Sequence, residues 1–119
     1  MTIESNVHAA IATVCPRVFP ILAPLKTTRP YVTVQNIGGT PNYYIDRQQA
    51  DKRTLRLLVK TWANGKDEAV ALARQVEAAM MAATAFTARV ESELLDDVET
   101  DAEPWLYSEL QEFVVIGPR

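Results

Sequence analysis

Apolar residues recur at spacings of three and four positions in two parts of the chain, the pattern of an amphipathic helix. The N-terminal stripe consists of Ile3, Val7, Ile11 and Val14, and Thr2 stands where a hydroxyl can cap the first turn. The second stripe spans residues 66–83 and is rich in alanine, which lets a helix approach a sheet closely. We therefore predict two helices, of which the second is the main cover of the core.

Alternation of apolar and polar residues, typical of half-buried strands, occurs before and after the second predicted helix. Val32 and Val34 share one strand face, and Leu55, Leu57 and Val59 share another. Strands are predicted in five places: a brief one near 18–19, long ones at 31–37 and 53–62, and two more at 86–91 and 105–116. The intervening residues 96–104 are acidic, end in a proline and are predicted to be a connection.

The elements thus follow the order α-β-β-β-α-β-β, which predicts an α+β fold. We expect one mostly antiparallel sheet of four to five strands, with the two helices packed on one face. A length of 119 residues with 48% hydrophobic content suits a single domain over residues 1–119. No apolar run reaches the roughly 20 residues that cross a bilayer, so we expect no membrane segment.

A long connection separates the two long strands. The first strand is expected to close at Gly38 and Gly39, and about a dozen residues then precede the second. Connections of that length in a compact domain are often functional. We predict a protruding hairpin arm over residues 38–51, in which Tyr43, Tyr44 and Arg47 contact a partner protein, because aromatic and Arg side chains anchor interfaces. The alternative is a polar hairpin tip without a partner.

Charge is distributed unevenly along the chain. Residues 1–90 hold eleven Lys and Arg against six Asp and Glu, giving +5, whereas residues 91–112 hold nine acids and no base, giving −9. Three explanations stay open: complementary surfaces between copies in a ring, an acidic channel lining that repels DNA, or a solvated acidic hairpin. For the first, we predict an interface between a basic and an acidic set of residues. These are Arg53, Arg56 and Lys60 on one side and Asp96, Asp97, Glu99, Asp101 and Glu103 on the other.

Residues that carry chemistry are few. His8 is the only histidine and Cys15 the only cysteine, so neither a second histidine nor an internal disulfide is available. The Gly38-Gly39 pair lacks the Lys-Ser or Lys-Thr ending of a phosphate-binding loop, and the acidic run lacks the spacing of a calcium-binding loop. We predict no catalytic residue, no metal site and no cofactor. A sequence pI of about 5.1 also argues against specific nucleic-acid binding.

Four short motifs resemble those of one protein family. They are Arg17-Val-Phe-Pro20, Arg29-Pro-Tyr-Val32, Ile37-Gly-Gly-Thr-Pro41 and Asp67-Glu-Ala-Val-Ala-Leu-Ala-Arg74. Their order and setting resemble the tail-terminator or tail-completion proteins of long-tailed bacteriophages and prophages. The resemblance is best over residues 11–83 and looser in the last strands.

The resemblance implies a minor tail protein without enzymatic activity. Such a protein caps the completed tail tube, stops its polymerisation and contributes to head-tail joining. The implied partners are further copies of the chain, the tail tube protein and head-tail connector proteins. The copies form a hexameric ring, either in solution or only once they are on the tail. The implied location is the tail of the virion, with assembly in the cytoplasm of the bacterial host. The alternatives are another head-tail connector or neck protein, and a small monomeric α+β binding module.

Overall fold

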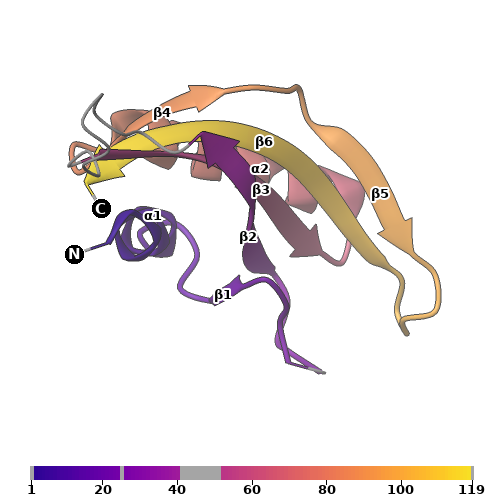
Figure 1. The fold of residues 1–119 in the computed structure, drawn as a ribbon. Coiled ribbons are helices and arrows are strands. Elements are labelled where there is room, and N and C mark those ends of the chain that lie inside the picture. The colour runs from indigo at the N-terminus through magenta and orange to yellow at the C-terminus, as the bar shows by residue number, and fades with distance from the viewer. Residues whose placement is uncertain (1, 25, 41–51, 119) are drawn as a thin grey trace.

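The structure is a computed structural model that describes residues 2–24, 26–40 and 52–118. It confirms the predicted α+β class and both predicted helices (Figure 1). The helices are α1 (Ile3–Ala12) and α2 (Lys66–Ala82). The strands are β1 (Val18–Pro20), β2 (Tyr31–Thr40), β3 (Lys52–Ala63), β4 (Thr87–Val90), β5 (Leu95–Glu99) and β6 (Leu106–Pro118).

The sheet is mixed and contains six strands in the described residues. Its order is β1-β2-β3-β6-β4, and β5 pairs with β6 beside β4. The pair β1 and β2 is parallel, while every other pair is antiparallel. The prediction of four to five mostly antiparallel strands was therefore wrong in number. The missed strand is β5, which lies in the segment predicted to be a connection, and its five residues are all exposed, so no apolar alternation marks it.

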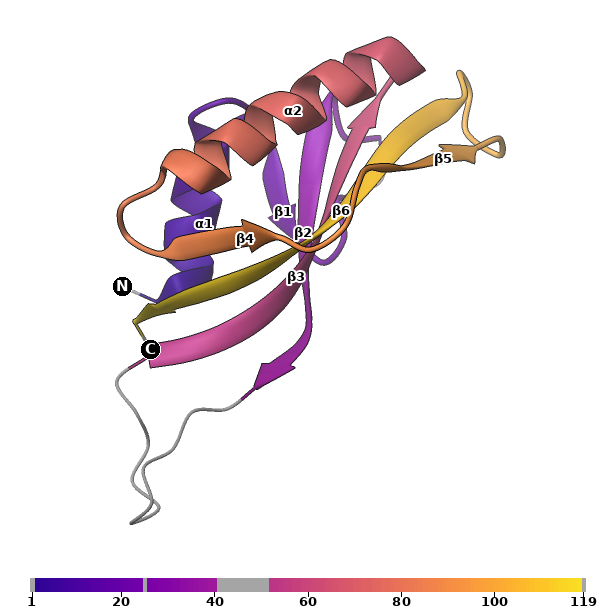
Figure 2. The ribbon, with the colours of Figure 1, turned by 90° about the horizontal axis from the view of Figure 1, so that it is seen from above.

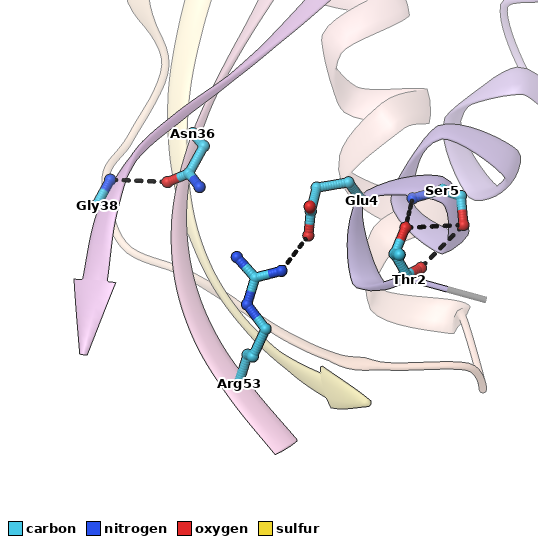
Figure 3. A network of polar contacts seen from close by, with 6 residues as sticks. All are labelled: Thr2, Glu4, Ser5, Asn36, Gly38 and Arg53. Atoms are coloured by element: carbon cyan, nitrogen blue, oxygen red, sulfur yellow. Dashed lines mark hydrogen bonds and ion pairs between the residues drawn. The ribbon is translucent and has the colours of Figure 1, made fainter. Parts of the chain in front are cut away.

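Gly38 and Gly39 do not close β2 but form an irregularity inside it. The pairing register between β2 and β3 shifts between Asn36 and Gly39, and both glycines have positive φ, at 122° and 139°. The backbone N–H of Gly38 donates to Oδ1 of Asn36 at 2.8 Å (Figure 3). A side chain at position 39 would overlap the carbonyl oxygen of Thr54, so the close approach of β3 requires glycine there.

Residues 38–40 of the predicted arm belong to β2, which continues to Thr40. Residues 41–51 lie outside the described residues.

Both helices pack on one face of the sheet, as predicted, and share a core with it. Helix α1 contributes the fully buried Ile3, Val7 and Ile11, and α2 contributes a second apolar stripe. The α2 stripe consists of Leu72, Val76 and Met80. It shares the core with Leu57, Val59, Phe113 and Val115 of the sheet. The first turn of α1 is capped as predicted, since Oγ1 of Thr2 accepts from the backbone N–H of Ser5 at 3.2 Å (Figure 3). Figure 2 shows α2 lying across the strands.

The other face of the sheet carries no helix formed by the described residues. On β3, strand alternation sends Arg56, Leu58, Lys60 and Trp62 to this face, and all four are half-buried. This helix-free face, together with the loops at its margins, is where unpartnered surface remains. No helix among the described residues is long and apolar enough to span a membrane.

Candidate interaction surfaces

The three arm residues predicted at an interface, Tyr43, Tyr44 and Arg47, lie outside the described residues. Their contact with a partner stays a prediction.

Arg53, the first of the three predicted basic interface residues, points to the helix side of β3. Its guanidinium Nη1 lies 2.9 Å from Oε1 of Glu4 in α1 (Figure 3). Both side chains are partly exposed, so the ion pair adds little stability, but it ties the start of α1 to the sheet. The charge of Arg53 is thus already matched within the chain.

The other two basic residues, Arg56 and Lys60, point to the helix-free face. Arg56 lies 3.6 Å from a carboxylate oxygen of Glu91 and 4.0 Å from one of Glu112. The Lys60 ammonium stands 5.6 Å from the centroid of the Trp62 ring, a cation–π distance. The three predicted basic residues therefore do not lie on one face of β3, and each contacts a group of its own chain.

The acidic set behaves differently. Asp96 forms an ion pair with Lys66 at 3.1 Å, but Asp97, Glu99, Asp101 and Glu103 form no ion pair with any Lys or Arg that the structure describes. Two of these carboxylates accept local hydrogen bonds: an oxygen of Asp97 accepts from the N–H of Val98, and one of Glu99 accepts from that of Asp101. An exposed group of carboxylates thus remains along β5 and the loop after it.

A buried carboxyl group that the sequence analysis missed lies beside this acidic set. Glu109 of β6 is only 2% exposed and stands directly opposite Asp96 of β5 in the strand register. Burial, then the hydrogen bond and negative charge of Asp96, raise the pKa of Glu109 to about 7. The same hydrogen bond and Lys66 lower the pKa of Asp96. Near neutral pH the two carboxyl groups can therefore share one proton, in which case Glu109 donates and Asp96 accepts.

The position of Glu109 could have been found from its neighbours. Gln111, Phe113 and Val115 follow it at intervals of two, and all are buried on the helix side of β6. An acid in register with such a series is an acid in the core.

An aromatic row crosses the helix-free face. Phe19 meets Tyr31 edge to face at a centroid distance of 6.3 Å, and Tyr31 stacks on Trp62 at 5.9 Å. The indole N–H of Trp62 donates to Oγ1 of Thr33 at 3.1 Å. Tyr31, Trp62 and Thr33 line the floor of an open groove of about 820 Å³, which we call the loop groove.

The walls of the loop groove come from distant parts of the sequence. Residues 21–24 form part of one wall and residues 102–104 part of the other. Arg29 ties the walls together, because its guanidinium donates to the carbonyl oxygens of Pro104 at 2.9 Å and Trp105 at 3.3 Å. It also donates to the side chain of Asn64, at the end of β3. Sequence periodicity gives no signal for such a contact.

A second groove, of about 580 Å³, lies between α1 and the strands β1 and β2. Its lining is mostly apolar and includes Val7, Val18 and Val34, with the exposed His8 at one side. Cys15 is buried. Within residues 2–24, 26–40 and 52–118, no three His, Cys, Asp or Glu side chains are placed to hold a metal ion.

Comparison with known protein families supports the resemblance in the sequence motifs. The family model described as "Tail completion protein gp17" matches residues 4–114. No curated protein matches the chain. The matched range runs from the first turn of α1 to residue 114 in β6, so it includes the loop groove and the acidic residues around β5.

Proposed function

Because the chain belongs to the tail completion protein family, whose role is structural, we propose that it caps the phage tail tube and ends its polymerisation. It acts as an oligomeric ring and contributes to joining the tail to the head. The observation that carries this proposal is the family match over residues 4–114, nearly the whole domain. The chain is a component of the virion tail, and we propose that it joins the tail in the cytoplasm of the bacterial host.

The surface supports a role carried out through contacts. Exposed apolar residues and unmatched carboxylates gather around the loop groove, which is lined by Ile21 and Leu22 as well as by Glu99 and Glu103. A structural protein needs such groups for its partners, since charges already matched within the chain contribute little to recognition. The proposed partners are further copies of the chain, the tail tube protein and head-tail connector proteins.

We propose no catalytic activity. The one shared-proton pair, Asp96 and Glu109, is placed for holding β5 against β6, and Lys66 balances its charge. Ser108 directly precedes Glu109 in β6, so strand alternation places its side chain on the opposite face of the sheet. The pair therefore has no neighbouring nucleophile on its own face among these residues.

Tail length is the test. Purified protein added to growing tail tubes of the phage or prophage that encodes the chain should stop elongation, and deletion of the gene should give overlong tails that do not join heads. Met81→Asp is a matched control, because Met81 is exposed on α2 and takes part in no proposed contact. Tubes that elongate unchanged with the wild-type protein, or normal virions after deletion, would refute the proposal.

A further inference from the structure

Two exposed aliphatic residues form a rigid apolar tip at the end of β1. The side chains of Ile21 and Leu22 are 69% and 80% exposed. The N–H of Ile21 donates to the carbonyl oxygen of Val34 at 2.8 Å, and the N–H of Leu22 donates to that of Pro20 at 2.6 Å. These bonds, with Pro20 before the tip and Pro24 after it, restrain the backbone. A backbone restrained in this way costs less entropy to fix when a partner binds.

The tip is also strained. Ile21 has φ of 64°, in the left-handed region that a β-branched residue rarely adopts. Strain of this kind persists where the surrounding structure enforces it, and it is found at binding sites. Here it holds two apolar side chains in solvent at a fixed position, where a partner can bury them.

The opposite edge of the sheet offers a matching surface. β1 and β5 lie at opposite edges, with β2, β3 and β6 between them (Figure 1). On β5, Leu95 is 63% exposed and Val98 is also exposed. By strand alternation Leu95 lies on the helix-free face of β5 and Val98 on the helix side, so each edge carries two exposed aliphatic residues, those of β5 on opposite faces.

The two edges have opposite charge. Near the tip, Arg17 and Arg29 already donate to carbonyl oxygens of their own chain, and the exposed base is Lys26. Lys26 lines the loop groove together with Glu99 and Glu103 but forms no ion pair with any carboxylate that the structure describes. Around β5 the carboxylates of Asp97, Glu99, Asp101 and Glu103 likewise find no cation among the described residues. An apolar tip beside an unpaired base thus corresponds to exposed aliphatic residues beside unpaired acids, and opposite charges orient two such surfaces.

We propose that the apolar tip of one copy docks against the β5 edge of the next copy, with Lys26 facing the carboxylates around β5. The contact joins two different surfaces, so it is head-to-tail and can close into a ring. It rests on the proposed function, because it supplies the contact between neighbours in the proposed ring. The contact is made by side chains, because Pro20 has no N–H with which to extend the ladder.

Cross-linking tests which surfaces meet. One preparation carries Leu22→Cys and another Leu95→Cys, and a short bis-maleimide is added to each alone and to their mixture, both free and on tail tubes. The native Cys15 is buried, and the wild-type protein controls for its reaction. The proposal expects covalent dimers in the mixture and few in either preparation alone. Dimers of Leu22→Cys with itself would show a symmetric contact and overturn the proposal, as would a mixture that gives no dimers with or without tubes.

Charge exchange tests how the surfaces recognise each other. Lys26→Glu and Glu99→Lys should each weaken self-association, and a mixture of the two variants should recover it in low salt. Leu22→Asp should weaken association about tenfold to a hundredfold, the effect of losing one buried aliphatic side chain. Met81→Asp, at another exposed apolar position, on α2, is the control and should leave it unchanged. Sedimentation of the free protein and of tube-bound protein measures each effect.

The outcomes separate the two proposals. If the wild-type protein caps tubes and Leu22→Asp caps them equally well, the docking proposal fails and the proposed function stands. If the wild-type protein neither associates with itself nor caps tubes, the proposed function fails as well.

Discussion

Replacing Glu109 by glutamine should stabilise the domain above neutral pH. The pKa of Glu109 is raised from 4.5 to about 7 in the folded protein, chiefly because its carboxyl group is buried. Between these values the folded state holds one proton more than the unfolded state, so the free energy of unfolding falls by about 1.4 kcal/mol for each pH unit. The contribution is complete below pH 4.5 and is lost as the pH rises through about 7. Over the whole window the loss is at most about 3.5 kcal/mol.

Glutamine stays neutral at every pH and still offers an N–H to Asp96, so Glu109→Gln should remove this dependence. At pH 8 the variant should melt roughly 10 °C above the wild type if the full difference is realised. Urea and thermal unfolding from pH 5 to pH 9 measure the effect. Glu103→Gln is the control, because Glu103 is exposed and has no ion-pair partner among the described residues. Parallel stability curves for the wild type and Glu109→Gln would refute the reasoning.

Two further substitutions test other parts of the fold. Gly39→Ala should lower the free energy of unfolding by more than about 1 kcal/mol, because the new methyl group meets the backbone of Thr54 and residue 39 has a positive φ. Gly65→Ala is the control, because a methyl group there meets no atom, and urea denaturation measures both variants. Arg29→Ala should cost about 1–3 kcal/mol and speed hydrogen exchange in the loop around Pro104, since it removes the bonds that join the walls of the loop groove. Unchanged exchange there would show that the walls are held by other contacts.

Elements that bury an apolar stripe could be predicted from the sequence. The spacing of Ile3, Val7 and Ile11 located α1, and the alternation of leucines located β3, because burial on one side imposes a period on the chain. Strand β5 has no such period: all its residues are exposed, and backbone pairing with β6 alone defines it. The expectation of one acidic connection failed for that reason.

The candidate surfaces were predicted less well, because contacts between distant residues decide them. Strand alternation alone separates Arg53 from Arg56, so their placement on opposite faces could have been read from the sequence. Whether each base finds an acid within the chain depends on the fold, as the pairing of Arg53 with Glu4 shows. The aromatic row and the bridge made by Arg29 join residues that are far apart in sequence, and no local pattern indicates them.

The position of β6 has a consequence for synthesis. This strand comes last in the domain, yet it pairs with β3, β4 and β5. A nascent polypeptide on the ribosome therefore lacks the pairing partner of β4 and β5 until the final residues of the domain emerge, and truncated products keep only β1, β2 and β3 as a sheet. Only finished molecules have both edges in place, which excludes incomplete ones from any assembly that uses the two together.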